Sequence, residues 1–149
     1  MARLPTFRWR AEWDGAALRA ILTRTLTTVT DVSGDGLQRI TDVQVTHTTA
    51  SGRVEELRIV FAHGDARIPE PDVRTVLRPA PDHLLQSTAF RVFVTRDDGQ
   101  VSRLGVEGVG AGHGVGFCQW GAIGRARAGQ RYGDILATYF PGTTVERLY

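Results

Sequence analysis

Glycines occupy every second position from residue 108 to residue 116, in the stretch GVGAGHGVG. This spacing favours an extended segment with one face free of side chains, against which another backbone, an aromatic ring or a flat sugar ring can lie. Each glycine costs about 0.5 to 1 kcal/mol relative to alanine in a regular element, so the spacing indicates that close approach matters here. The close partner is either a neighbouring element of the same domain or a bound ligand.

Two nucleotide-binding motifs are excluded by these residues. A dinucleotide fingerprint needs glycines in the order G-x-G-x-x-G, and the third position after each candidate glycine pair holds histidine, valine or phenylalanine. A Walker A loop needs a lysine, and the sequence contains none.

Length and charge bound the class of protein. A chain of 149 residues with 42% hydrophobic content fits one domain with a real core. The 18 basic side chains, all arginine, nearly balance 16 acids, so the sequence shows no basic footprint and no nucleic-acid partner is expected. The single cysteine forms no internal disulfide. No apolar run approaches the roughly 18 to 20 residues of a membrane span, and the N-terminus lacks the pattern of a signal peptide.

Hydrophobic periodicity predicts both helices and strands. Asp14 is a predicted N-cap, and an apolar helical stripe follows from Leu18 to Leu26. Alternating apolar residues predict a hairpin over residues 43–61 and a second one over residues 90–106, which turns at Asp98-Gly99.

Further short elements complete the expected fold. Helices are predicted over residues 71–77, over 117–128 with Gly129 as the stop, and around 135–140, and the closing residues 143–149 are expected to form a strand. We therefore expect a single α+β domain over residues 1–149, with antiparallel β-hairpins flanked by three or four short helices.

Four side chains with useful chemistry lie in or directly after the glycines. His113 stands between two glycines, so its imidazole suits a proton shuttle or a hydrogen bond to a hydroxyl, with a structural role as the alternative. Gln119 and Trp120 offer an amide and an indole, which suit a carbohydrate surface, and Trp120 fits a core position equally. Cys118 is expected to be a small buried residue at a helix start. The remaining histidines show no ligand spacing, so we expect no metal and no cofactor.

The residues from 112 to 143, GHGVGFCQWGAIGRARAGQRYGDILATYFPGT, closely resemble the C-terminal signature of the SpoIID/LytB family. This family comprises the stage II sporulation protein D and amidase-enhancer proteins of bacterial cell walls. GRVEELRI at 52–59, VRTVL at 73–77 and LLQSTAFRV at 84–92 follow the order of that family with weaker specificity. The resemblance covers most of the chain from about Gly34 onward.

The resemblance implies work on peptidoglycan. Sporulation members are lytic transglycosylases that cleave glycan strands lacking stem peptides, and amidase-enhancer members are associated with modulating a wall amidase. The proposed catalytic glutamate and a zinc-linked Cys/His set lie in an N-terminal segment of the family that has no counterpart here, so we expect only the C-terminal part of the domain. Glycoside cleavage needs a carboxylic acid with a raised pKa. The candidate acids in this sequence are Glu12, Glu55, Glu56 and Glu107. None of them matches the position of the catalytic glutamate in the family, so the catalytic residue is unknown.

Three functional hypotheses follow. The first is the glycan-binding part of a SpoIID-like lytic transglycosylase, inactive alone, whose substrate cleft is lined by Gly112, His113, Gly114, Gln119 and Trp120. The alternative is a non-catalytic amidase-enhancer module that binds peptidoglycan and modulates a wall amidase. A third is an inactive fragment with an apolar face exposed around Trp9 and Trp13. Expected partners are peptidoglycan glycan strands and either the missing N-terminal half or a wall amidase, and the expected location is extracytoplasmic or cell-wall associated.

Overall fold

The described residues form two three-stranded antiparallel sheets, in the strand orders β1-β6-β5 and β2-β3-β4. The computed structural model describes residues 7–32, 36–112, 114 and 117–146. Its elements are β1 (Arg8–Asp14), α1 (Gly15–Thr25), the 3-10 turns η1 (Leu26–Thr28) and η2 (Gly36–Gln38), β2 (Ile40–Thr48), β3 (Val54–Phe61), β4 (Asp65–Pro69), α2 (Glu70–Val76), β5 (Phe90–Asp97), β6 (Gln100–Val109), α3 (Gln119–Arg127) and α4 (Tyr132–Tyr139). The α+β class with antiparallel hairpins and short helices is confirmed.

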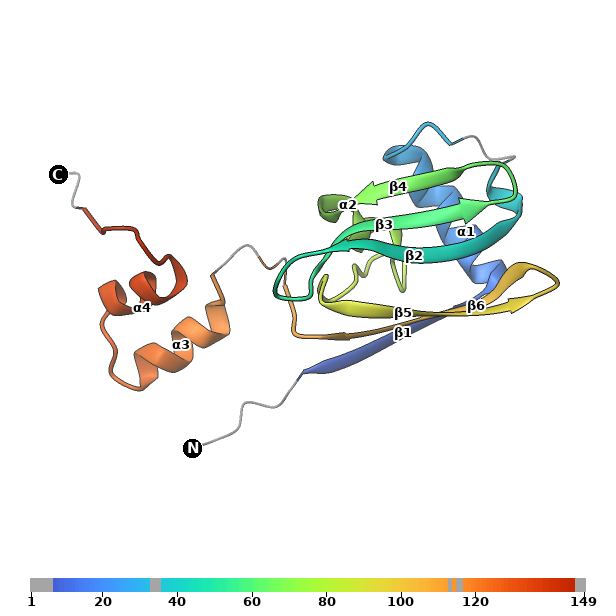
Figure 1. Cartoon of the computed structure of the whole chain (residues 1–149). Helices are drawn as coiled ribbons and strands as arrows, with labels where there is room; N and C mark the ends of the chain where they lie inside the picture. The colour runs from blue at the N-terminus through green and yellow to red at the C-terminus, as the bar shows by residue number, and fades with distance from the viewer. Residues whose placement is uncertain (1–6, 33–35, 113, 115–116, 147–149) are drawn as a thin grey trace. The chain divides into compact units, whose positions relative to one another are not determined.

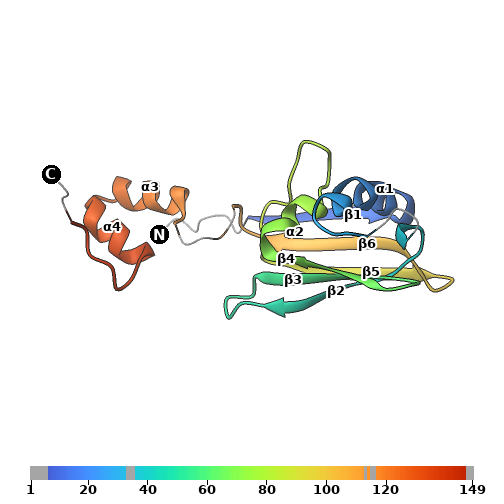
Figure 2. The ribbon, with the colours of Figure 1, turned by 90° about the horizontal axis from the view of Figure 1, so that it is seen from above.

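The chain divides into two compact units, Met1–Gly112 and His113–Tyr149. The first unit holds both sheets with α1 and α2, and the second holds α3 and α4 (Figure 1). Within the first unit α1 packs on β1 and β6, and α2 packs on β3 and β4 (Figure 2).

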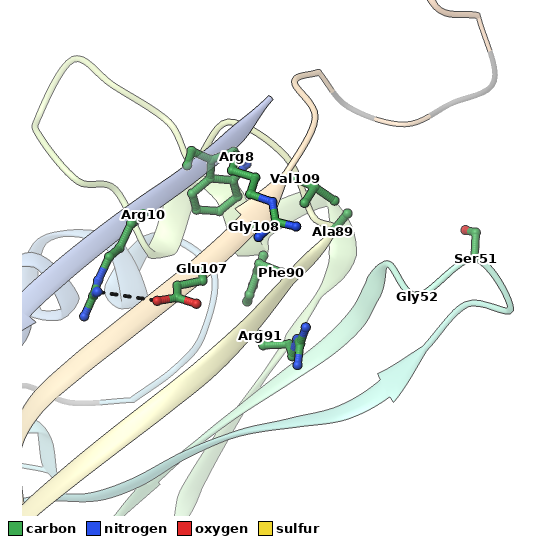
Figure 3. Close-up of a pocket in the computed structure, with 11 residues that line it drawn as sticks. Arg8, Arg10, Ser51, Gly52, Ala89, Phe90, Arg91, Glu107, Gly108 and Val109 are labelled. Atoms are coloured by element: carbon green, nitrogen blue, oxygen red, sulfur yellow. Dashed lines mark ion pairs between the residues drawn. The ribbon is translucent and has the colours of Figure 1, made fainter. Parts of the chain in front are cut away.

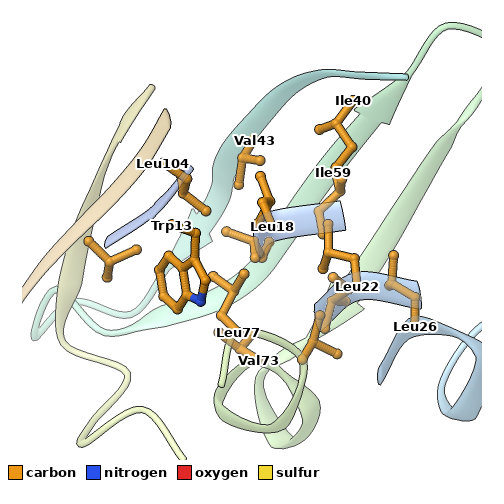
Figure 4. Packing of buried hydrophobic residues seen from close by; sticks show 14 of the residues in the cluster. Trp13, Leu18, Leu22, Leu26, Ile40, Val43, Ile59, Val73, Leu77 and Leu104 are labelled. Carbon is orange, nitrogen blue, oxygen red and sulfur yellow. The ribbon is translucent and has the colours of Figure 1, made fainter. Parts of the chain in front are cut away.

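The core of the first unit forms where α1 meets both sheets. The Asp14 carboxylate caps α1 by accepting a hydrogen bond of 2.8 Å from the backbone N–H of Ala17, as predicted. Leu18 and Leu22 on the apolar stripe of this helix are completely buried. They meet side chains from both sheets and from α2 (Figure 4). Each such leucine contributes about 1.5 to 3 kcal/mol through burial.

Strand β1 corrects the prediction for the N-terminal region. Residues 8–14 pair antiparallel with β6, and their alternation turns Trp9 and Trp13 inward, where both are buried. The indole N–H of Trp9 donates to Ser87 Oγ at 3.3 Å, and that of Trp13 donates to the carbonyl of Arg78 at 3.1 Å. The hypothesis of an exposed apolar face at these tryptophans is therefore wrong. Strand β4 was also missed.

The hairpin of β5 and β6 forms as predicted. Asp98 and Gly99 adopt φ angles of 48° and 72°, the left-handed conformations that a two-residue hairpin turn requires. This hairpin places β6 at the centre of its sheet, between β1 and β5.

In the second unit, an aromatic side chain that precedes α3 packs against two aromatic side chains at the end of α4. The ring of Phe117 lies 5.2 Å from that of Tyr139 and 6.2 Å from that of Phe140. The spacing of Gly121 and Gly124 predicts that another element approaches α3 closely at both positions. Gly121 faces Tyr139 so closely that an added Cβ would lie 2.1 Å from its hydroxyl oxygen, which confirms close approach there. Gly124 has no atom within 4 Å of such a Cβ, so the prediction is wrong at Gly124.

The predicted C-terminal strand is not found in residues 143–146, which adopt no regular structure, and residues 147–149 lie outside the described part. Over residues 117–146 the second unit contains helices only, so no strand is available there to pair with this segment.

Candidate functional site

The glycine-rich stretch does not continue as an extended ribbon. Strand β6 ends at Val109, and Gly110, Gly112 and Gly114 adopt φ angles of 75°, 105° and 73°. These left-handed conformations favour glycine because other residues are strained there. The extended conformation expected from the alternation is therefore wrong at Gly110, Gly112 and Gly114, because alternate glycines occur in an irregular loop as readily as on a bare strand face.

Of Gly108, Gly110 and Gly112, only Gly108 is required for close packing. An added Cβ would lie 2.2 Å from Cζ2 of Trp9, its cross-strand neighbour, whereas Gly110 and Gly112 have nothing within 4 Å. The close partner at Gly108 is thus an element of the same unit.

The residues predicted to line a glycan cleft are placed as follows. Gly112 donates its N–H to the carbonyl of Gln86 at 2.7 Å, which fixes the start of the loop to the first unit. His113 lies outside the described residues, and Gly114 is a described loop residue. Gln119 begins α3, and Trp120 lies in the same helix with its side chain outside the described part. Glycan binding by these five residues remains a prediction.

Cys118 occupies the N-cap of α3. Its Sγ accepts a weak hydrogen bond of 3.4 Å from the N–H of Gly121. The thiol is exposed, so the expected buried position is wrong although the helix start is confirmed. An N-cap side chain must face the open end of the helix, which keeps it near solvent.

Gln119 lines an apolar groove of about 370 Å³ in the second unit. The groove lies between α3 and α4, and its other walls are Phe117, Ala122, Ile123, Ala126, Tyr132, Ile135 and Leu136. The amide of Gln119 and the hydroxyl of Tyr132 are the polar side-chain groups among these lining residues.

A larger groove of about 550 Å³ lies on the first unit (Figure 3). It is lined by residues 8–10 of β1, 89–91 at the start of β5, 107–109 of β6 and 51–52 in the turn between β2 and β3. Three arginines and one glutamate are its charged side chains, namely Arg8, Arg10, Arg91 and Glu107. The groove is therefore electropositive and suits an anionic group.

The strand register explains why these charges meet. Arg10 and Arg91 both lie opposite Glu107, on the two strands that flank β6. Directly opposite residues share one face of a sheet. Arg10 Nη1 lies 3.5 Å from Glu107 Oε1, and the same guanidinium also pairs with Glu12.

This groove is not apparent in the sequence, because its charged residues come from strands far apart in the chain. The alternation RWRAEWD at residues 8–14 was the available signal, since it predicts arginines on one face and tryptophans on the other.

The other two glutamates considered as acids lie in β3. Glu56 accepts a hydrogen bond of 2.7 Å from Thr46 Oγ1, and its carboxylate lies 3.3 Å from Arg67 Nη1. The Thr46 hydrogen bond first, and then the charges of Arg67 and His47, hold the pKa of Glu56 below its ordinary value of 4.5. Glu55 is exposed.

Comparison with known proteins places the chain in a family. Residues 2–116 match a family described as a domain of unknown function (DUF8618). The chain belongs to that family.

Two curated relatives match about half of the chain. One is the amidase enhancer of Bacillus subtilis (strain 168), 35% identical over 78 residues, which are 52% of this chain and 10% of that protein. The other is an uncharacterized protein of Brachyspira hyodysenteriae (strain ATCC 49526 / WA1), 39% identical over 74 residues, which are 50% of this chain and 18% of that protein. The chain thus spans only a small part of the length of these relatives. Within the described residues, no helix is both long and apolar enough to cross a membrane.

Proposed function

We propose that this chain is a non-catalytic cell-wall module of the amidase-enhancer type, which binds peptidoglycan and modulates a wall amidase. The observation that carries the proposal is the 35% identity to an amidase enhancer over half of the chain. The resemblance of residues 112–143 to the SpoIID/LytB signature supports membership of that family and an extracytoplasmic location.

The environments of the glutamates favour binding over cleavage. A general acid in glycoside cleavage must keep its proton near neutral pH, and a neighbouring arginine stabilises the ionised form instead. Glu56 accepts a hydrogen bond from Thr46 and faces Arg67, and both hold its pKa below the ordinary value. The carboxylate of Glu56 is therefore suited to accept hydrogen bonds rather than to donate a proton. Glu12 and Glu107 both contact the guanidinium of Arg10.

The predicted glycan contacts are part of this proposal. His113 and Gln119 offer hydrogen bonds to sugar hydroxyls, and the indole of Trp120 offers an apolar surface for a sugar ring. Gly112 and Gly114, the neighbours of His113 in the sequence, adopt left-handed conformations that favour glycine.

Sedimentation with purified peptidoglycan sacculi tests the binding. The full chain is expected to pellet with the sacculi, and His113→Ala and Trp120→Ala are expected to reduce the pelleted fraction. His63→Ala, at an exposed turn between β3 and β4, is the control for loss of an imidazole. A chain that stays in the supernatant would contradict the proposal.

Two activity measurements test the role. A wall amidase digesting the same sacculi is expected to release peptides at a changed rate when the chain is added. The chain alone is expected to release no fragments with anhydro-sugar ends. Release of such fragments by the chain alone would instead support the lytic transglycosylase hypothesis.

A further inference from the structure

Strand β1 forms an open edge of the β1-β6-β5 sheet (Figure 1). The backbone N–H of Gly110 donates to the carbonyl of Phe7 at 2.8 Å, so Phe7 and every second residue after it face β6. The intervening residues Arg8, Arg10 and Glu12 therefore direct their backbone N–H and C=O groups away from β6. No residue in the described part of the chain pairs with these groups. β1 thus offers a row of donors and acceptors to an incoming strand.

The other sheet edges are protected against such pairing in different ways. β4 has only five residues and ends at Pro69. β2 departs from a regular register at three points along β3. β5 is approached by the second sheet, since Arg96 of β5 donates to the carbonyl of Thr41 in β2 at 3.0 Å. β1 has seven residues, no proline and no register shift against β6, so it lacks these protections.

The exposed charges along β1 are arranged in a self-complementary order. The strand reads RWRAEWD, with two arginines in its first half and two acids in its second half. In an antiparallel pair with a second copy of β1, a register centred on Ala11 places Arg10 opposite Glu12 of that copy. The same register places Arg8 opposite Asp14. Every exposed charge of one strand then faces an opposite charge, and the small side chain of Ala11 lies opposite itself.

This register also satisfies the backbone. Arg10 and Glu12 both direct their backbone groups to the open edge, so their pairing closes hydrogen bonds across the interface. A shift by two residues in either direction sets Arg10 or Glu12 opposite its own copy, where like charges repel. Arg10 also contacts Glu12 and Glu107 of its own chain, so the new pairs extend an existing charge network. The edge therefore favours one partner in one register.

We propose that a second copy of this chain adds to β1, so that two three-stranded sheets join into one sheet of six strands. Backbone hydrogen bonds supply the affinity, and the charge order of β1 supplies the specificity. One strand pair is a small interface, so we expect a dissociation constant of about 10 to 100 µM. The proposal is independent of the proposed wall-binding function.

Sedimentation velocity of the full chain tests the dimer. The mean sedimentation coefficient is expected to rise from the monomer value toward the dimer value between about 1 and 300 µM. A chain that stays monomeric throughout this range would overturn the proposal.

Charge reversal on β1 tests the partner and the register. Arg10→Glu leaves acids at both positions of the central charge pair, and Glu12→Arg leaves arginines at both, so each variant alone is expected to dimerise about tenfold more weakly. An equimolar mixture of the two variants is expected to dimerise like the parent chain, because each acid then faces an arginine. Loss of folding in a variant could not produce this recovery on mixing. A mixture as monomeric as its separate components would refute the pairing.

Arg91→Glu is the matched control, because it reverses one exposed arginine on the same sheet, in β5 rather than in β1. It is expected to dimerise like the parent chain. Circular dichroism spectra and melting temperatures report whether each variant retains the fold. A loss of dimer as large for Arg91→Glu as for Arg10→Glu would rule out β1 as the site.

A disulfide tests the symmetry of the pair. Cys118 is the single cysteine and is exposed, so the background for this test is Cys118→Ala. Ala11→Cys is expected to link two copies, because residues opposite each other without hydrogen bonds have Cα atoms about 4.5 Å apart. Arg8→Cys is the control, since its two copies lie about 20 Å apart in this register although Arg8 is more exposed than Ala11.

A residue-11 variant that forms the disulfide no faster than the residue-8 variant would contradict the proposed register. Each of these readouts is made without peptidoglycan. Failure of the parent chain to pellet with sacculi would refute the wall-binding function while leaving the dimer intact.

Discussion

Gly108 in β6 lies directly against the indole of Trp9 in β1, its cross-strand partner. An added Cβ would lie 2.2 Å from Cζ2 of the indole and 2.9 Å from the carbonyl oxygen of Ala89. The indole is held in place by its hydrogen bond to Ser87 and by an edge contact with Phe90 at 6.1 Å. The packing of Trp9 on the inner face of this sheet therefore requires that residue 108 has no side chain.

Gly108→Ala is expected to destabilise the first unit by about 3 kcal/mol, the upper part of the range for overpacking, because backbone and a buried ring both oppose the new methyl group. Gly105→Ala is the control in the same strand, since its Cβ meets only ordinary contacts, the nearest at 3.7 Å. Urea unfolding followed by tryptophan fluorescence measures both. Equal midpoints for the two variants would contradict the packing argument.

Ser87 and Thr88 are adjacent and completely buried, but their hydroxyl groups differ in hydrogen bonding. Ser87 Oγ accepts from the Trp9 indole and donates to the carbonyl of Val109 at 2.7 Å, whereas Thr88 Oγ1 has no partner among the described residues. Ser87→Ala is expected to cost about 1 to 3 kcal/mol, because it leaves a buried N–H unpaired. Thr88→Val, which replaces an unpaired hydroxyl with a methyl group of similar shape, is expected to be neutral or stabilising.

Thermal unfolding of the two variants under identical conditions measures this difference. A Thr88→Val variant that is as unstable as Ser87→Ala would show that both hydroxyls form hydrogen bonds essential to the fold.

Features encoded over a few residues could be predicted from the sequence. The Asp14 cap, the Asp98-Gly99 turn and the stop at Gly129, which has a φ of 87°, each depend on neighbours within one turn of chain. Such local signals survive in the folded protein because the same backbone geometry produces them in any context.

Features that depend on distant partners could not be predicted in the same way. Strand β1 forms because β6 accepts it across more than 80 intervening residues, and the basic groove needs three strands in one register. The alternating glycines do not distinguish between two structural causes. Close packing at Gly108 and left-handed backbone at Gly110 produce the same spacing in the sequence.

Gly121 and Gly124 lie in the same helix, α3, and differ in how closely other atoms approach them. Gly121 faces the Tyr139 hydroxyl, while Gly124 is open. Gly124→Ala is expected to stabilise the helix by about 1 kcal/mol, the difference in helix propensity between the two residues. Gly121→Ala is expected to lose this gain, because Tyr139 must move away from Phe117, its neighbour at 5.2 Å. Helix content measured by circular dichroism during heating distinguishes the two, and a more stable Gly121→Ala variant would contradict the contact.

The hydrogen bond from Thr46 to Glu56, between β2 and β3, predicts how the stability of the protein depends on pH. The pKa of Glu56 lies below its ordinary value of 4.5, chiefly because Thr46 donates to the carboxylate and secondarily because of Arg67 and His47. The unfolded chain therefore binds more protons between the two values, so the contribution of Glu56 to stability is fully present above about pH 4.5 and is lost as the pH falls through the folded pKa. Thr46→Val is expected to raise the Glu56 pKa toward 4.5, and Arg67→Gln is expected to raise it less. Titration of the Glu56 carboxyl carbon by NMR measures both shifts, and a larger shift for Arg67→Gln would show that charge, rather than the hydroxyl, dominates this site.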